Sequence, residues 1–314
     1  MSNSLDHLLP APDEAVRCAE HARTITLDPG GTAIRADRVV VVTTPLPWPK
    51  PALDHPLLTV AAEVARHSAR PTRLLAAAPD DNGPGLVVVY DRVGGTAIEA
   101  RHRIDAADPD APDALAALVV GPAPAEAHTP ARPALLICTQ GSHDVCCGSE
   151  GARLAEELAG AKRSGTGFEL FRVSHTGGHR FAPTAMTIPD GRMWSGLDAS
   201  DVEAIFSQKN PSPEGSLIDR CRGWWGADTG SAQIAERAVF AELGWSLDAQ
   251  ARSVEVATAG DTAAETTCVV TTATHRWTVE LELGREVPTI ACRAQGGLPT
   301  KMAQEYRVVS VSRS

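Results

Sequence analysis

The sequence predicts an α/β fold in two halves, followed by a small β-rich C-terminal extension. Three observations support this prediction. In both halves, short apolar runs alternate with helix-forming stretches. The order of these segments is roughly the same on either side of a stretch rich in proline and alanine at residues 121–133. From residue 253 onward, apolar and polar residues alternate as they do in strands.

In the first half, residues 38–43 (RVVVVT) form an apolar run bounded by polar residues, which is typical of a strand buried on both faces. A short helix is predicted before this strand, at residues 13–22. After a proline-rich turn, the expected elements are a helix at 58–66, strands at 72–77 and 85–90, and a helix at 111–118.

Residues 121–133 (GPAPAEAHTPARP) lack an apolar period, as linkers do, so we place a domain boundary there. The expected elements beyond it are a strand at 134–137, a helix at 151–159, strands at 168–174, 184–188 and 192–196, and a helix at 201–208 capped by Ser200. The predicted domains are residues 1–125, 134–245 and 246–314.

The remainder of the chain predicts a helix at 231–243 and a β-rich extension over 253–311, where WTVELEL at 277–283 shows the alternation most clearly. Trp224 and Trp225 could form an exposed docking patch. Because each carries a large apolar area, we expect them in the core instead.

Composition limits the classes of function. The chain has 314 residues, and its 29 basic and 39 acidic side chains give a net charge of -10. This charge argues against nucleic acid or an anionic membrane surface as a partner and is compatible with a basic redox protein. The sequence shows no signal peptide and no apolar run long enough to span a bilayer, so the expected location is the cytoplasm.

The seven cysteines are odd in number and lack the repeating framework of secreted disulfide-rich domains, so reduced thiols are expected. Four of them are expected to pack as small buried residues rather than to act as ligands. These are Cys18, Cys221, Cys268 and Cys292.

Potential metal ligands gather in one segment of the chain. Three thiols, Cys138, Cys146 and Cys147, precede two imidazoles, His175 and His179. Two thiolates and two imidazoles can complete the coordination of one zinc ion or supply the four terminal ligands of a [2Fe-2S] cluster. The ligand count alone does not choose between these centres.

The spacing argues against an ordinary zinc finger. Eight residues separate Cys138 from Cys147, whereas the knuckle of a structural zinc site has two to four. Gly177 and Gly178 disfavour the helix that carries the paired histidines of a small finger.

These residues resemble the sucrase/ferredoxin-like family, whose cluster-bearing part is similar to a thioredoxin-like [2Fe-2S] ferredoxin. The resemblance rests on CTQGSHDVCCGSEG at 138–151 and SHTGGHRFAPTAMTIPDGRMWSGL at 174–197, and more loosely on the chain around them. It implies that a [2Fe-2S] cluster is held by Cys138, Cys147, His175 and His179. Cys146 leaves the second thiolate ambiguous by one position.

The resemblance also implies a thioredoxin-like fold for residues 134–245. Because the first half repeats the order of elements, we expect residues 1–125 to form a second, degenerate thioredoxin-like domain in tandem. That domain has no ligand set, so its expected role is scaffolding or docking of a partner.

The implied function is that of a soluble one-electron carrier that serves a redox partner protein, rather than an enzyme with its own substrate. With two thiolates and two neutral imidazoles the oxidised cluster is uncharged, so its potential should lie above the roughly -400 mV of all-cysteine plant-type clusters. Histidine ligands can release a proton from their second nitrogen on oxidation, so transfer is proton-coupled where those nitrogens reach solvent.

Two other functions use the same residues. One is a zinc-binding structural module with the same four ligands. The other is a thiol-disulfide oxidoreductase that pairs Cys138 with Cys146 or Cys147, which leaves the histidines unexplained. Arg180, His143 and Asp144 are candidates to contact the ligands from outside, although His143 fits a surface loop equally well.

Overall fold

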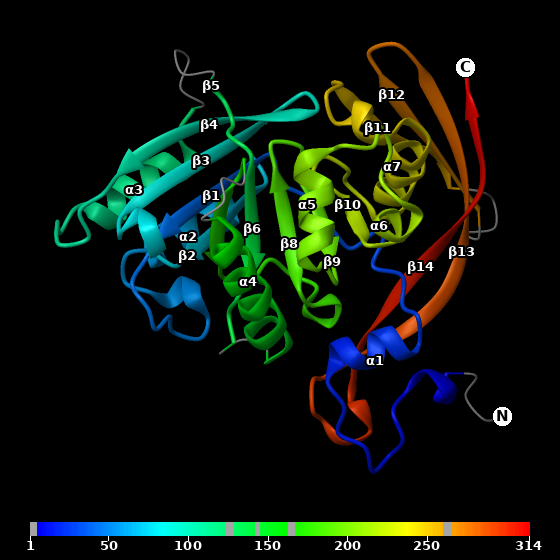
Figure 1. Cartoon of the computed structure of the whole chain (residues 1–314), viewed down its shortest axis with the longest axis horizontal. Helices are drawn as coiled ribbons and strands as arrows, with labels where there is room; N and C mark the ends of the chain where they lie inside the picture. The colour runs from blue at the N-terminus through cyan, green and yellow to red at the C-terminus, as the bar shows by residue number, and fades with distance from the viewer. Residues whose placement is uncertain (1–4, 123–128, 142–144, 163–166, 260–264) are drawn as a thin grey trace.

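The computed structural model describes residues 5–122, 129–141, 145–162, 167–259 and 265–314, and it folds them around two β-sheets (Figure 1). The strands of the larger sheet are β1 (Arg38–Thr43), β2 (Thr72–Ala77), β3 (Leu86–Val93), β4 (Thr96–Arg103), β5 (Thr129–Pro130), β6 (Ala134–Cys138), β7 (Glu169–Val173), β8 (Thr184–Ile188), β9 (Arg192–Ser195) and β10 (Cys221–Trp224). They lie in the order β10-β9-β8-β6-β7-β2-β1-β3-β4-β5.

The smaller sheet is antiparallel and follows at the C-terminal end, as expected for a β-rich extension. Its strands, in spatial order, are β11 (Arg252–Ala259), β12 (Glu265–Thr272), β13 (Arg276–Ile290) and β14 (Pro299–Arg313). The prediction of a mixed α/β fold with a small additional sheet is therefore confirmed. Among the described residues, no helix has both the length and the apolar character needed to cross a bilayer.

The two halves of the ten-stranded sheet repeat one arrangement. β1 pairs parallel with β2 and antiparallel with β3, which forms a hairpin with β4. In the same way, β6 pairs parallel with β7 and antiparallel with β8, which forms a hairpin with β9. Helices occupy matching places, namely α2 (Thr59–His67) and α3 (Ala111–Val120) in the first half, and α4 (Ala152–Lys162) and α5 (Ala199–Ser207) in the second.

The halves join edge to edge, where β2 meets β7 in antiparallel orientation. Ala77 lies opposite Val173. Two backbone hydrogen bonds, from Ala78 N to Arg172 O and from Ser174 N to Ala76 O, are each 2.8 Å long. One continuous sheet thus contains strands of the predicted domains 1–125 and 134–245. The domain boundaries themselves stay a prediction.

β1 is buried on both faces, as its apolar sequence predicts. In β1, Val40 and Val42 belong to a cluster with α2 and α3. Val39 and Val41 point to the opposite face, into a cluster that also contains Leu136 of β6. Trp224 and Trp225 lie in this second cluster at 0% exposure, so the prediction that they belong to the core is confirmed.

Several elements differ from the prediction. β4 and β10, together with the short helix α6 (Gly215–Asp219), were not expected. The cap of α5 is Asp198, not Ser200. The Asp198 carboxylate accepts from Asp201 N at 3.0 Å while Asp198 N donates to the Asp201 carboxylate at 2.8 Å. This reciprocal pair satisfies two amides of the first turn, which a single serine hydroxyl cannot do.

α7 (Gly230–Leu243) packs against β10 and against all four strands of the smaller sheet. Its residues Val239 and Phe240 share a core cluster with Trp194 of β9 and with Trp277 of β13. The helix therefore links the edge of the large sheet to the C-terminal sheet, as seen at the right of Figure 1.

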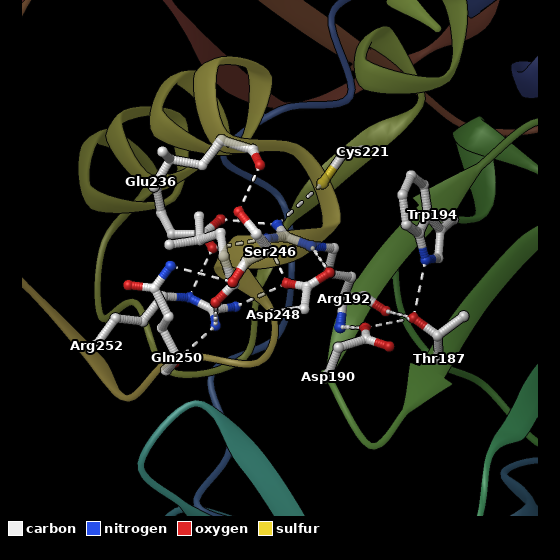
Figure 2. A network of polar contacts seen from close by, with 12 residues as sticks. Thr187, Asp190, Arg192, Trp194, Cys221, Glu236, Ser246, Asp248, Gln250 and Arg252 are labelled. Atoms are coloured by element: carbon white, nitrogen blue, oxygen red, sulfur yellow. Dashed lines mark hydrogen bonds and ion pairs between the residues drawn. The ribbon is translucent and has the colours of Figure 1, made fainter. Parts of the chain in front are cut away.

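A buried ion network reinforces this junction (Figure 2). Arg192 of β9 lies 2.9 Å from the Glu236 carboxylate of α7 and 2.6 Å from Asp248. Arg252, at the start of β11, lies 2.8 Å from Glu236 and 3.2 Å from Asp248. Although burial opposes ionisation, the two guanidinium groups hold the pKa of Glu236 below its ordinary value.

Candidate metal centre

Cys138 is the last residue of β6, and the loop that carries the predicted histidines follows β7. Because β6 and β7 are parallel, with Cys138 opposite Val173, both chain segments leave the sheet at the same edge. Backbone Thr139 N donates to Val173 O at 3.0 Å, and His175 N donates to the Gln140 side-chain oxygen at 3.2 Å. The sheet thereby brings Cys138 and His175 together.

Cys147 approaches the same place from the beginning of the helical segment that leads into α4. It opens a single π-helical turn, Cys147–Gly151, and its side chain is fully buried. Its Sγ lies 3.7 Å from Thr184 Oγ1 of β8, and its side chain also hydrogen bonds to the Cys138 thiol. Three of the four predicted ligands thus lie together, with Cys138 and Cys147 buried and His175 partly buried.

The loop from His175 to His179 turns sharply at its two glycines. Gly177 and Gly178 have φ angles of 81° and 70°, in the region that favours glycine. A Cβ atom at Gly178 would also collide with the guanidinium group of Arg222. This turn leaves the rings of His175 and His179 with their centroids 6.4 Å apart.

The surroundings favour the ionised form of the Cys138 thiol. Hydrogen bonding by the Cys147 side chain lowers the pKa of Cys138 well below its ordinary value, and bonds from the His175 side chain and from the backbone of Gln140 and Thr176 add to this effect, which outweighs burial. A thiolate is the form of cysteine that ligates metals.

Three arginines line this region. Arg73 donates to His175 O, and Arg222 donates to Gly177 O at 3.1 Å. Burial, together with the neighbouring Arg180, lowers the pKa of Arg222 to about 10, against the opposing influence of the Cys147 and Cys138 thiols. Within the described part of the chain, Arg222 makes no ion pair with a carboxylate.

Cys146 points into a different group of side chains. Its Sγ lies 3.7 Å from Cys18 Sγ and 3.6 Å from Cys292 Sγ. The three sulfur atoms all lie within 4.8 Å of one another, a grouping compatible with metal binding. His179 borders it, with Nδ1 3.1 Å from Cys18 Sγ.

Sequence reasoning missed Cys18 and Cys292 as members of a thiol group. They lie 128 and 146 residues from Cys146, and nothing in the local sequence around either one points to the others. Cys221 and Cys268 are buried, as expected.

Of the residues predicted to contact the ligands from outside, only Arg180 falls in the described part of the chain. Its guanidinium group stacks on the Phe181 ring at 4.6 Å, and its pKa is lowered by burial, with the Cys18 thiol acting in the opposite direction. His143 and Asp144 lie outside the described residues.

The fold and the site together define a mixed α/β protein with buried thiols and partly buried imidazoles at one edge of its main sheet. The chain belongs to the sucrase/ferredoxin-like family, since the model of that family matches residues 29–223. The match covers all four predicted ligands and excludes Cys18 and Cys292. Neither a curated protein nor a solved structure matches the chain.

The donor set fits a transition metal. Buried cysteine thiols with one stabilised as thiolate, beside an imidazole in hydrogen-bond contact, are ligands suited to zinc or iron.

Proposed function

We propose that this protein is a one-electron carrier whose [2Fe-2S] cluster is held by Cys138, Cys147, His175 and His179. The observation that carries the proposal is the convergence of buried Cys138 and Cys147 with partly buried His175, from three separate segments, beside the buried Arg222. When bound, the cluster would accept and release one electron.

The protein's own residues would set the conditions for that transfer. Two thiolates and two neutral imidazoles bring less negative charge than four thiolates, which favours reduction. The buried guanidinium group of Arg222 favours it further. Nδ1 of His179 contacts Cys18, so a cluster at this histidine would use Nε2.

The two cysteines that follow each other in sequence differ in direction, which supports Cys147 as the second thiolate. The Cys147 side chain bonds to Cys138, whereas Cys146 contacts Cys18 and Cys292. A disulfide of Cys138 with Cys146 or Cys147 remains the mechanism of the alternative oxidoreductase, and zinc at the four ligands remains the alternative metal centre.

We further infer that the two halves are thioredoxin-like domains in tandem. The support is that each half places a parallel pair beside an antiparallel hairpin, in the same strand order. The first half would then act as a scaffold, because Arg73 of β2 donates to the carbonyl of His175. The electron would pass to or from a partner protein, and the chain's net charge of -10 favours a basic one.

The test is a visible absorption spectrum with iron and acid-labile sulfide analysis on protein purified without oxygen. The wild type should absorb broadly and contain about two irons and two sulfides per chain. Cys138→Ser, Cys147→Ser and His175→Ala should lose or alter the spectrum, while Cys146→Ser should keep it.

A colourless protein that contains zinc, or no metal after anaerobic reconstitution, would overturn the electron-carrier proposal. Zinc lost from Cys138→Ser would favour the structural module. Loss of two free thiols on mild oxidation of a metal-free protein, absent in Cys138→Ser, would favour the oxidoreductase. A spectrum lost in Cys146→Ser and kept in Cys147→Ser would exchange the two thiolates.

A further inference from the structure

We propose that Cys18, Cys146 and Cys292 form a second metal site, which takes a zinc ion through three thiolates. It is distinct from the four-ligand centre proposed above. The vicinal cysteines divide between the two sites, with Cys147 directed to Cys138 and Cys146 to Cys18 and Cys292.

The sulfur positions match the geometry of zinc. A tetrahedral zinc ion with Zn–S bonds of about 2.3 Å holds its thiolate sulfurs about 3.8 Å apart. The separations from Cys146 Sγ are 3.7 Å to Cys18 and 3.6 Å to Cys292, and all three atoms lie within 4.8 Å of one another. A zinc ion therefore requires only small movements of the side chains.

Three distant segments of chain are fixed at this point, so the grouping does not depend on one loop. Arg293 N donates to Val16 O and Gly296 N donates to Glu14 O, both at 2.8 Å. These bonds hold the connection between β13 and β14 against the segment that precedes α1 (Cys18–Thr24). Arg23 of α1 pairs with Glu150 at 3.1 Å, which holds α1 against the turn that follows Cys146. Figure 1 shows α1 beside the C-terminal part of β13.

Burial and access also suit a bound ion. Cys18 and Cys146 are at most 1% exposed, whereas Cys292 is partly exposed and gives an entry path. Three thiolates and Zn²⁺ carry one net negative charge. Arg180 is a neighbouring cation that interacts electrostatically with the Cys18 thiol. His179 Nδ1 can donate to the Cys18 sulfur at 3.1 Å, as groups beside metal ligands commonly do.

The experiment compares zinc uptake by the full-length, anaerobically reduced protein with that of Cys18→Ser/Cys146→Ser/Cys292→Ser, by competition against a chromophoric chelator. The wild type should bind one more zinc ion than the triple variant, and Co²⁺ in its place should give thiolate charge-transfer absorption that the triple variant lacks. Because Cys292 is partly exposed, the single variant Cys292→Ser should fold, and it tests the site even if the triple variant does not fold. Its affinity should fall by more than the roughly 10- to 100-fold that loss of an outer contact costs.

Cys221→Ser/Cys268→Ser, which removes two buried thiols elsewhere, is the matched control and should bind zinc as the wild type does. Equal zinc affinity in the wild type and Cys292→Ser, or an equal loss in the control, would show packed thiols only and overturn the proposal. Cys138→Ser/Cys147→Ser separates the two sites. It should lose any iron and keep the zinc difference, so failure of either proposal is visible without the other.

Discussion

Arg222 is the single residue whose charge should matter most at the predicted cluster site. It is buried, donates to Gly177 O and Thr32, and within the described residues has no carboxylate partner. In general, a unit charge about 8 Å from a redox centre changes the free energy of one-electron reduction by about 2 kcal/mol at an effective dielectric constant of about 20. This corresponds to a shift of about 90 mV in the reduction potential.

Arg222→Gln should therefore lower the reduction potential by about 50–100 mV, as measured by redox titration of the visible spectrum. Arg222→Lys keeps the charge and should stay close to the wild type. Arg220→Gln, which removes a neighbouring arginine paired with Asp201, serves as the control. An unchanged potential in Arg222→Gln would place the electron centre elsewhere.

Asp190, in the turn between β8 and β9, gives a second prediction at this scale. Burial, followed by the charge of Asp248, raises its pKa from the ordinary 3.8 to about 6. Between about pH 4 and 6 the unfolded chain ionises this group while the folded protein retains the proton, so the free energy of unfolding falls as pH rises. The total loss is at most about 3 kcal/mol.

Asp190→Asn keeps an oxygen that can accept from Thr187 Oγ1 and Arg192 N, as Asp190 does at 2.6 and 2.8 Å. Its stability relative to the wild type should increase from pH 4 to pH 6 and remain higher at pH 7. Urea unfolding at several pH values measures this difference. A difference that is independent of pH would contradict the assigned shift.

Among individual residues, the sequence indicates the features that depend on residues adjacent in the chain. His175 and His179 flank a glycine pair that the structure places at positive φ, as a tight turn requires. Cys18 and Cys292 were assigned only to packing, because their contacts with Cys146 arise from tertiary structure. The identities of the four cluster ligands stay a prediction.

At the scale of elements, α7 depends on its buried ion network as well as on its apolar side chains. Glu236 is fully buried between Arg192 and Arg252. Glu236→Ala leaves two guanidinium groups buried with less compensation, so the free energy of unfolding should fall by about 3–5 kcal/mol. Chemical denaturation monitored by tryptophan fluorescence measures the change.

Glu203→Ala is the matched control, because Glu203 pairs with Lys209 at the surface and both side chains are mostly exposed. It should unfold at the same denaturant concentration as the wild type. If Glu236→Ala behaved like this control, the network would be unimportant for stability.

The elements that sequence predicted well are those with a strong local pattern. β1 and β2 were predicted to the residue, because an apolar run bounded by polar residues marks a doubly buried strand. β4 was missed because its outer part, EARHR at 99–103, is charged. β10 was missed because Cys221–Trp224 is short, and because its arginine and glycine do not form the apolar pattern of a buried strand although all four residues are buried.

At the scale of the whole molecule, the order of elements predicted two similar halves but not how they meet. The pairing of β2 with β7 joins one strand edge from each half, and the sequence of either strand does not identify its partner. The same holds for α7, whose place between two sheets follows from tertiary packing.

The join between β2 and β7 has a consequence during synthesis of the chain. β2 ends at Ala77 and its partner strand ends at Val173, so the edge of the first half stays open while the intervening chain is made. At about 5–20 residues per second this takes roughly 5 to 20 seconds. Over that interval the nascent first half presents unpaired amide and carbonyl groups, which makes it a target for chaperones and for aggregation on crowded polysomes.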